Sequence, residues 1–197
     1  MSILFPALYD VVMTPFERGR FLEIRKTLLC GAHGTVLEIG SGTGINFPLY
    51  EDAEQVIAIE PDIFMRERSL PRAQNARVPI VVVPATGERL PFRDNVFDSV
   101  VGTLVFCTVP EPLVALQEVR RVAKRRARLL LFEHVRLGNP LLGSLQDRLT
   151  PAWKWICGGC HLNRNPLELT MNSGFKVASA AGHYRNLFQV IEAVNNK

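Results

Sequence analysis

Three glycines at alternate positions are the first residues in this chain whose spacing suggests chemistry. Gly40, Gly42 and Gly44 follow a largely apolar run, residues 36–39, where a strand should turn sharply. Glycine accepts a positive φ angle and has no Cβ, so a ligand can approach the backbone of such a turn closely. The free N–H groups of the helix expected next, at about 44–51, would point toward that ligand.

An acid at the end of the next predicted strand extends this pattern. A second apolar run, residues 56–59, leads into Glu60, which lies 20 residues after Gly40. A carboxylate in that position can accept hydrogen bonds from both hydroxyls of a ribose. The glycine spacing is G-x-G-x-G, so the third glycine of the dinucleotide fingerprint G-x-G-x-x-G is missing. The residues therefore predict a nucleoside site, with a tight turn that binds nothing as the alternative.

The elements that would position these residues alternate along the chain. Strands are predicted at 35–39, 56–60, 80–83, 97–101, 128–134, 175–181 and 187–194, and helices at 16–30, 44–51, 62–76 and 111–124. Nearly continuous apolar strands that alternate with helices indicate a parallel sheet covered on both faces. Ligands of such sheets bind outside the carboxyl ends of the strands. The glycine turn, Glu60, and segments 85–88 and 103–108 all fall at such ends.

The composition favours one globular domain. The chain has 197 residues, of which 47% are hydrophobic and 21% charged, with a net charge of +4. The basic run 120–128 contains no aromatic residue, which argues against a nucleic-acid groove and favours a solvated helix end. The apolar run 2–9 lacks the features of a signal peptide and is too short to span a bilayer. We expect a cytoplasmic protein without a nucleic-acid partner, for which weak peripheral membrane contact stays open.

Four cysteines raise the question of metal or redox chemistry. Residues 157–161 read Cys-Gly-Gly-Cys-His, which matches both the c-type haem attachment pattern and a redox C-x-x-C motif. Haem attachment requires export, and a zinc site requires further ligands for which no second C-x-x-C or paired histidine exists. We therefore expect reduced thiols without metal or haem, in a turn that lines a substrate pocket.

Further motifs make the nucleoside pattern specific to one family. Segments 36–44, 58–61, 87–92 and 94–98 resemble successive motifs of the type 11 class I S-adenosylmethionine-dependent methyltransferases, which are similar to enzymes of ubiquinone and menaquinone biosynthesis. The resemblance covers about residues 9–182. It implies a Rossmann-like α/β fold whose seven-stranded, mostly parallel sheet carries helices on both faces, with the final strand antiparallel.

Later segments resemble one branch of that family. Residues 103–110, 132–135 and 158–164 are similar to the branch that contains the thiol S-methyltransferases. The branch implies methyl transfer from S-adenosylmethionine to a small, partly apolar acceptor, with a thiol favoured and S-adenosylhomocysteine as the product. An N-methyltransferase acting on a phospholipid or another amine, a quinone-type C- or O-methyltransferase, and a non-catalytic protein that binds S-adenosylmethionine remain alternatives.

The resemblance implies a single methyltransferase domain over residues 1–197. Its expected parts are an N-terminal helical lid (1–30), a cofactor-binding core (36–135), an acceptor-side insert (136–174) and C-terminal strands (175–197).

Cofactor contacts carry over from the family residue by residue. Gly40, Gly42 and Gly44 would pass under the methionine and the ribose, Glu38 would lie near the methionine amino group, and Glu60 would bind the ribose hydroxyls. The other contacts expected along the cofactor, including its adenine and methionine ends, are Ser41, Thr43, Asn46, Pro61, Met65, Ala85, Thr86, Gly87, Glu88, Thr103 and Leu104.

Two departures from the family pattern stand out. Thr86 replaces an Asp that many relatives have, so recognition of adenine would pass to the backbone or to the hydroxyl. Residues 124–127 read Lys-Arg-Arg-Ala, where relatives often have a Pro-Gly-Gly turn before the fifth strand. The second departure affects the expected loop geometry and leaves cofactor binding intact.

The acceptor pocket is expected between the N-terminal segment and residues 134–164. The cofactor would occupy the strand ends as far as the fourth strand, so its methyl group must face this stretch. The candidate catalytic residues are His134, which would remove a proton from a thiol, and Asp147. The expected substrate contacts are Tyr9, Trp153, Cys160 and His161.

Overall fold

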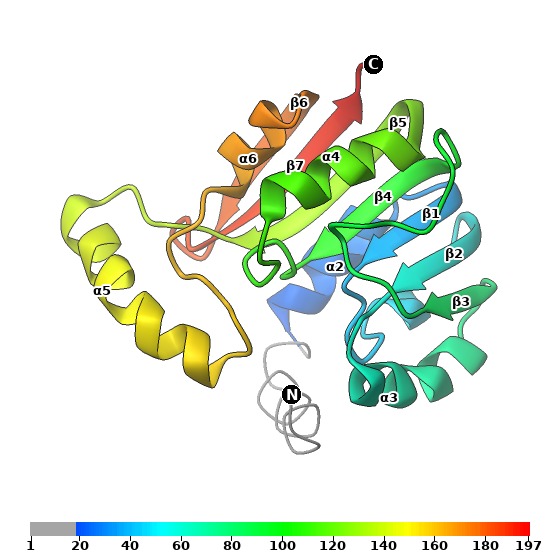
Figure 1. The fold of residues 1–197 in the computed structure, drawn as a ribbon, viewed down its shortest axis with the longest axis horizontal. Helices are drawn as coiled ribbons and strands as arrows, with labels where there is room; N and C mark the ends of the chain where they lie inside the picture. Colours follow the sequence, from blue (N-terminus) through cyan, green and yellow to red (C-terminus); the bar gives the residue numbers. More distant parts are fainter. Residues whose placement is uncertain (1–18) are drawn as a thin grey trace.

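A seven-stranded sheet forms the centre of the computed structural model, which describes residues 19–197 (Figure 1). Its strands are β1 (Gly34–Ile39), β2 (Ala53–Ile59), β3 (Ile80–Val83), β4 (Phe97–Thr103), β5 (Ala123–His134), β6 (Phe175–His183) and β7 (Phe188–Asn195). They lie in the order β3-β2-β1-β4-β5-β7-β6. The first five pair in parallel, whereas β7 pairs antiparallel with both β5 and β6. The predicted seven-stranded sheet, including its antiparallel last strand, is confirmed.

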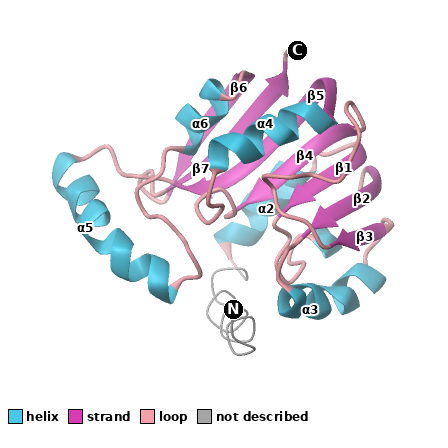
Figure 2. Cartoon of the chain, in the orientation of Figure 1, coloured by secondary structure: helices cyan, strands magenta, loops and turns pink. Residues whose placement is uncertain are grey.

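Helices cover both faces of this sheet (Figure 2). They are α2 (Arg20–Leu29), α3 (Ile63–Gln74), α4 (Pro112–Val122), α5 (Pro140–Ile156) and α6 (Pro166–Asn172), with a short 3-10 helix η1 (Phe47–Leu49). Side chains of a strand alternate between its two faces. Accordingly Leu129 and Leu131 of β5 join the buried cluster that contains residues of α4, while Leu130 and Phe132 join the cluster that contains residues of α2.

The segment after the glycine turn is not the predicted α-helix. Residues 44–51 form turns and the 3-10 helix η1, in which Pro48 has no N–H group to donate. Gly44 has a φ of 78°, and its N–H donates to the Ser41 carbonyl at 2.9 Å. The turn therefore does not continue into the predicted α-helix.

The basic run 120–128 is only partly a helix end. Arg120 and Arg121 end α4, but the following residues already belong to β5, which begins at Ala123. The pairing of β4 with β5 shifts register between Phe97 and Ser99, and Arg126 adopts a φ of 63° in this irregular stretch. A residue with a positive φ thus lies within segment 124–127, which departs from the expected family pattern.

The helix α5 projects away from the sheet (Figure 1). Its buried residues are Gly143, Gln146 and Thr150, so the face turned toward the protein is largely polar. Apolar side chains at helical spacing are exposed instead: Leu141, Leu145, Leu149, Trp153 and Ile156. None of the helices within residues 19–197 combines the length and the apolar character needed to cross a membrane.

Candidate cofactor and acceptor site

The glycine turn adopts the backbone conformation that its sequence predicts. Gly40, Gly42 and Gly44 have φ angles of 59°, 55° and 78°. A Cβ on Gly40 would collide with Val105, whereas a Cβ on Gly42 would meet no atom within 4 Å. Positive φ angles favour glycine at all three positions, and the turn has an open side at Gly42 that a ligand can approach.

Glu60 ties the glycine turn to the end of β2. Its Oε2 accepts a hydrogen bond from the Gly42 N–H at 3.0 Å, and its Oε1 accepts one from the Asp62 N–H at 2.9 Å. Burial raises the pKa of Glu60, while these two backbone hydrogen bonds lower it. Each carboxylate oxygen has a second lone pair, so Glu60 can still accept hydrogen bonds from two ribose hydroxyls.

A buried polar network lies on the other side of the turn. Glu38 accepts hydrogen bonds from the Asn46 amide at 2.9 Å and from the Tyr50 hydroxyl at 2.8 Å. Burial raises the pKa of Glu38 to about 7, although both hydrogen bonds and the charge of Arg25 lower it. Asn46 in turn accepts a hydrogen bond from Arg25 at 2.9 Å, so one amide bridges two buried ionisable groups.

Arg25 is the functional candidate that the motifs missed. Its guanidinium also donates to the Thr103 hydroxyl at 2.7 Å, and the residue is only 2% exposed. The signal in the sequence is a charged residue on the apolar face of a helix, between Ile24 and Leu28. Family motifs do not include this helix, so the motif search did not reach Arg25.

These residues surround a small hollow of about 50 Å³ at the carboxyl ends of β1 and β4. Its lining residues are Arg25, Gly40, Ser41, Gly42, Thr43, Ile45, Asn46, Thr103 and Leu104. The Ser41 hydroxyl is buried and has no hydrogen-bond partner among residues 19–197. A guanidinium, an unpaired hydroxyl and glycine backbone around one hollow fit the amino-acid end of S-adenosylmethionine.

The expected adenine contacts lie along the same edge of the sheet. Pro61 and Met65 follow β2, and residues 85–88 follow β3. Met65 is buried, whereas Thr86 is exposed and forms an isolated bridge with Arg89. The parallel strands β1, β2 and β3 therefore place these residues beside the glycine turn, as the sequence predicts.

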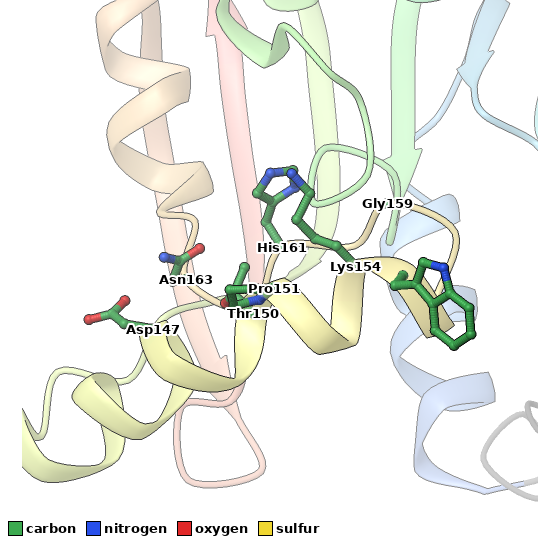
Figure 3. A pocket seen from close by; sticks show the side chains of 8 residues that line it. Asp147, Thr150, Pro151, Lys154, Gly159, His161 and Asn163 are labelled. Carbon is green, nitrogen blue, oxygen red and sulfur yellow. The ribbon is translucent and has the colours of Figure 1, made fainter.

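A larger, more open hollow of about 630 Å³ lies against α5 (Figure 3). Its lining residues are Asp147, Thr150, Pro151, Lys154, Trp155, Gly159, His161 and Asn163. It contains none of the glycine-turn residues, which line the smaller hollow. The predicted residues Asp147 and His161 do share this larger hollow.

The two candidate catalytic residues lie in different surroundings. Asp147 is exposed and pairs with Arg136 at 2.8 Å, while Gln146 rather than Asp147 contacts His134, at 3.5 Å between the two Nε2 atoms. Burial lowers the pKa of His134 to about 4, and its Nδ1 has no hydrogen-bond partner within the described part of the chain. Such an imidazole is a weak base for a thiol of pKa about 8.5. The role of His134 as the base that removes a proton from a thiol stays a prediction.

The predicted substrate contacts are only partly brought together. Cys160 and His161 follow α5, which contains Trp153. His161 lines the larger hollow, whereas Trp153 and Cys160 are not among its lining residues. Tyr9, expected in the lid, lies outside the described residues.

Known proteins that resemble this chain are methyltransferases. The family model described as a methyltransferase domain matches residues 37–131. Thiol S-methyltransferase TMT1B of Rattus norvegicus is 38% identical over 152 residues, which are 75% of this chain and 62% of that protein. TMT1B of Homo sapiens is 33% identical over 184 residues, which are 89% of this chain and 73% of that protein.

A solved structure shows the same fold. An S-adenosylmethionine-dependent methyltransferase from Thermotoga maritima, described as a possible histamine N-methyltransferase, has a TM-score of 0.71 and 22% identity, and the match covers 98% of this chain and 97% of that one. The glycine turn, the acid after β2 and the strand order agree with a methyltransferase assignment. The chain belongs to the family of S-adenosylmethionine-dependent methyltransferases.

Proposed function

We propose that this protein transfers the methyl group of S-adenosylmethionine to the sulfur of a small, partly apolar thiol. The observation that carries the cofactor half is the hollow between the glycine turn and Arg25, together with Glu60, which accepts a hydrogen bond from the Gly42 N–H of that turn. The thiol half is supported by the TMT1B relatives, whose names state that activity. The chain spans 62% of the rat relative and 73% of the human one, so acceptor chemistry is the part most in need of a test.

The residues around the hollow suggest how the cofactor would be held. Glu60 would accept hydrogen bonds from the ribose hydroxyls, and the guanidinium of Arg25 would pair with the methionine carboxylate. Glu38 is not among the lining residues, so its expected effect on the methionine amino group would act through Asn46. When bound, S-adenosylmethionine supplies a methyl group activated by a positively charged sulfur.

The chain's remaining contribution would be alignment and exclusion of water. Holding two reactants in line can lower a barrier by about 7–11 kcal/mol, whereas a general base contributes about 10²–10⁴-fold in rate. His134 is a poor base because burial lowers its pKa to about 4. We therefore propose that the acceptor thiol loses its proton without His134, and that the walls of the pocket come from residues 134–164.

Comparison of acceptors tests this function. The wild-type protein is incubated with S-adenosylmethionine and, separately, a small aromatic thiol, an alkyl amine, a phenol and phosphatidylethanolamine vesicles, with release of S-adenosylhomocysteine as the readout. We expect release with the thiol, together with the methyl thioether as product. Turnover of an amine or lipid alone would contradict the thiol proposal, and no turnover with any acceptor would favour a non-catalytic binding protein.

A further inference from the structure

Three of the four cysteines gather where the loop after β4 meets the end of α5. Cys107 is buried in that loop, and Cys157 and Cys160 are partly exposed after the helix. The thiols of Cys107 and Cys160 shift each other's pKa, lowering that of Cys160 and raising that of Cys107. The His161 N–H donates to the Cys107 carbonyl at 2.8 Å, so backbone contact holds these segments together. The paired thiols therefore come from segments far apart in the sequence.

The glycines between Cys157 and Cys160 direct this pairing. Gly158 and Gly159 have φ angles of 57° and 97°, which few other residues adopt. The Cys160 N–H donates to the Cys157 carbonyl at 3.2 Å and closes a tight turn. The N–H of His161, the next residue after Cys160, donates to the Cys107 carbonyl at 2.8 Å, so the backbone brings Cys160 next to Cys107. The geometry thus favours Cys107, rather than the neighbour in the C-x-x-C motif, as the partner of Cys160.

The two paired sulfurs differ in accessibility and in charge. The hydrogen bond from Cys107 lowers the pKa of Cys160 to about 7, with help from Trp153 and Arg164 and against the effect of burial. The same hydrogen bond, burial and the nearby Glu133 raise the pKa of Cys107 well above its usual value. Arg164 is fixed by hydrogen bonds to the carbonyls of Phe106 and Val109. A partly exposed thiol with a lowered pKa therefore lies near a buried thiol.

We propose that Cys160 and Cys107 form a redox-active dithiol that reduces low-molecular-weight disulfides. The Cys160 thiolate attacks one sulfur of the small disulfide, forms a mixed disulfide and releases one small thiolate. The Cys107 sulfur then attacks the Cys160 sulfur, and its proton goes to the second small thiolate as that group leaves. The products are two small thiol groups, one of them as thiolate, and a Cys107–Cys160 disulfide, so two electrons have passed to the small disulfide.

This disulfide would join the end of α5 to the loop that borders the cofactor hollow. The Cys107 thiol also contacts the carbonyl of Leu104 at 3.5 Å, and Leu104 lines that hollow. The thiol–disulfide exchange itself uses Cys107 and Cys160, which do not line that hollow. It can therefore be measured without S-adenosylmethionine and does not depend on the acceptor proposed above.

Disulfide mapping of the full-length protein tests the proposal. The reduced wild type is exposed to 2-hydroxyethyl disulfide at neutral pH, quenched with acid, and analysed as intact protein and as unreduced peptides. We expect a mass loss of two hydrogen atoms and a cross-link between Cys107 and Cys160. At about pH 5.5 the cross-link should form on the order of tenfold more slowly, since the thiolate is the attacking species.

Three single variants separate the roles of the thiols. Cys160→Ser should prevent the cross-link, Cys107→Ser should accumulate the mixed disulfide on Cys160, and Cys157→Ser should behave as the wild type does. A cross-link between Cys157 and Cys160, or modification confined to exposed Cys30, would overturn the proposal. If Cys107→Ser fails to fold, the wild-type peptide map still decides the pairing.

Discussion

At the scale of single residues, the site depends on charges buried around one amide. Arg25 and Glu38 lie on opposite sides of Asn46, which donates to one and accepts from the other. The motif at residues 36–44 includes Glu38 but not Arg25, because a motif search finds residues clustered in sequence. Arg25 precedes Glu38 by 13 residues and reaches the site only through the packing of α2. A buried charge on an apolar helix face was the one signal available.

Replacing Arg25 tests whether this guanidinium contacts the cofactor. Arg25→Ala should weaken binding of S-adenosylmethionine by about 10–150-fold, the equivalent of about 1.5–3 kcal/mol for a charge-assisted hydrogen bond. Arg25→Lys should recover part of the lost affinity, because lysine keeps the positive charge but lacks the paired N–H donors of the planar guanidinium. Isothermal calorimetry measures the affinity, with Arg20→Ala on the same helix as the control. Unchanged affinity in folded Arg25→Ala would contradict the assignment.

We expect the stability of the protein to depend on pH through Glu133. Its side chain is fully buried and accepts hydrogen bonds from the N–H groups of Val105 and Phe106, and burial raises its pKa to about 7. The Glu133 carboxyl therefore keeps its proton in the folded state up to about pH 7, whereas in the unfolded state it loses the proton near pH 4.5. Its contribution to stability is fully present below pH 4.5 and is lost as the pH rises through about 7.

Glu133→Gln removes this titration while keeping an acceptor oxygen. Between about pH 5 and 8 the free energy of unfolding of the wild type should fall relative to the variant by on the order of 1–3 kcal/mol. Urea unfolding at several pH values measures the difference. Parallel stability curves for the two proteins would show that Glu133 does not titrate in this range.

At the scale of elements, the sequence predicted strands better than the connections between them. The apolar residues 129–132 of the predicted strand 128–134 lie in β5, because burial on both faces of a strand requires continuous apolar residues. Residues 44–51 and 123–127 were misassigned, since turns and register shifts depend on local backbone geometry that hydrophobic pattern does not encode. Within the candidate site, the sequence located the glycine turn and Glu60 for the same reason: both lie at strand ends.

The start of β5 contains a residue whose backbone favours glycine. Arg126 has a φ of 63°, a conformation that costs a non-glycine residue about 1 kcal/mol or more. Arg126→Gly should therefore raise the free energy of unfolding by about 1 kcal/mol, measured by urea denaturation. Arg125→Gly is the matched control and should lower it, since Arg125 is not among the positive-φ residues. Destabilisation by both substitutions would show that Arg126 is not strained.

At the scale of the whole molecule, apolar side chains are buried in the two clusters that cover the sheet but exposed on α5. Leu116 of α4 is 1% exposed within the cluster on one sheet face, whereas Leu145 of α5 is 51% exposed. Helical spacing alone predicts burial for both, because an apolar stripe on a helix usually faces the core. The sequence could not show that α5 turns its polar side inward, as this orientation depends on contacts such as Gln146 with the Val135 carbonyl at 3.2 Å.

Two leucine substitutions compare these helices. Leu116→Ala should lower the free energy of unfolding by about 2–5 kcal/mol, because it leaves a cavity in a packed core. Leu145→Ala should change it by about 0.5 kcal/mol or less, as expected for an exposed position. Chemical denaturation measures both. A large loss for Leu145→Ala would mean that its side chain is packed in solution.

Binding of S-adenosylmethionine through Glu60 is the central claim, and calorimetry tests it most directly. The wild type should bind S-adenosylmethionine and not NADH, and Glu60→Ala should bind it about 10–150-fold more weakly, because the ribose loses a charge-assisted hydrogen-bond partner. Glu51→Gln, which alters an exposed acid paired with Arg77, should bind as the wild type does. Equal affinity of folded Glu60→Ala and wild type, or tight binding of NADH in place of S-adenosylmethionine, would contradict the account.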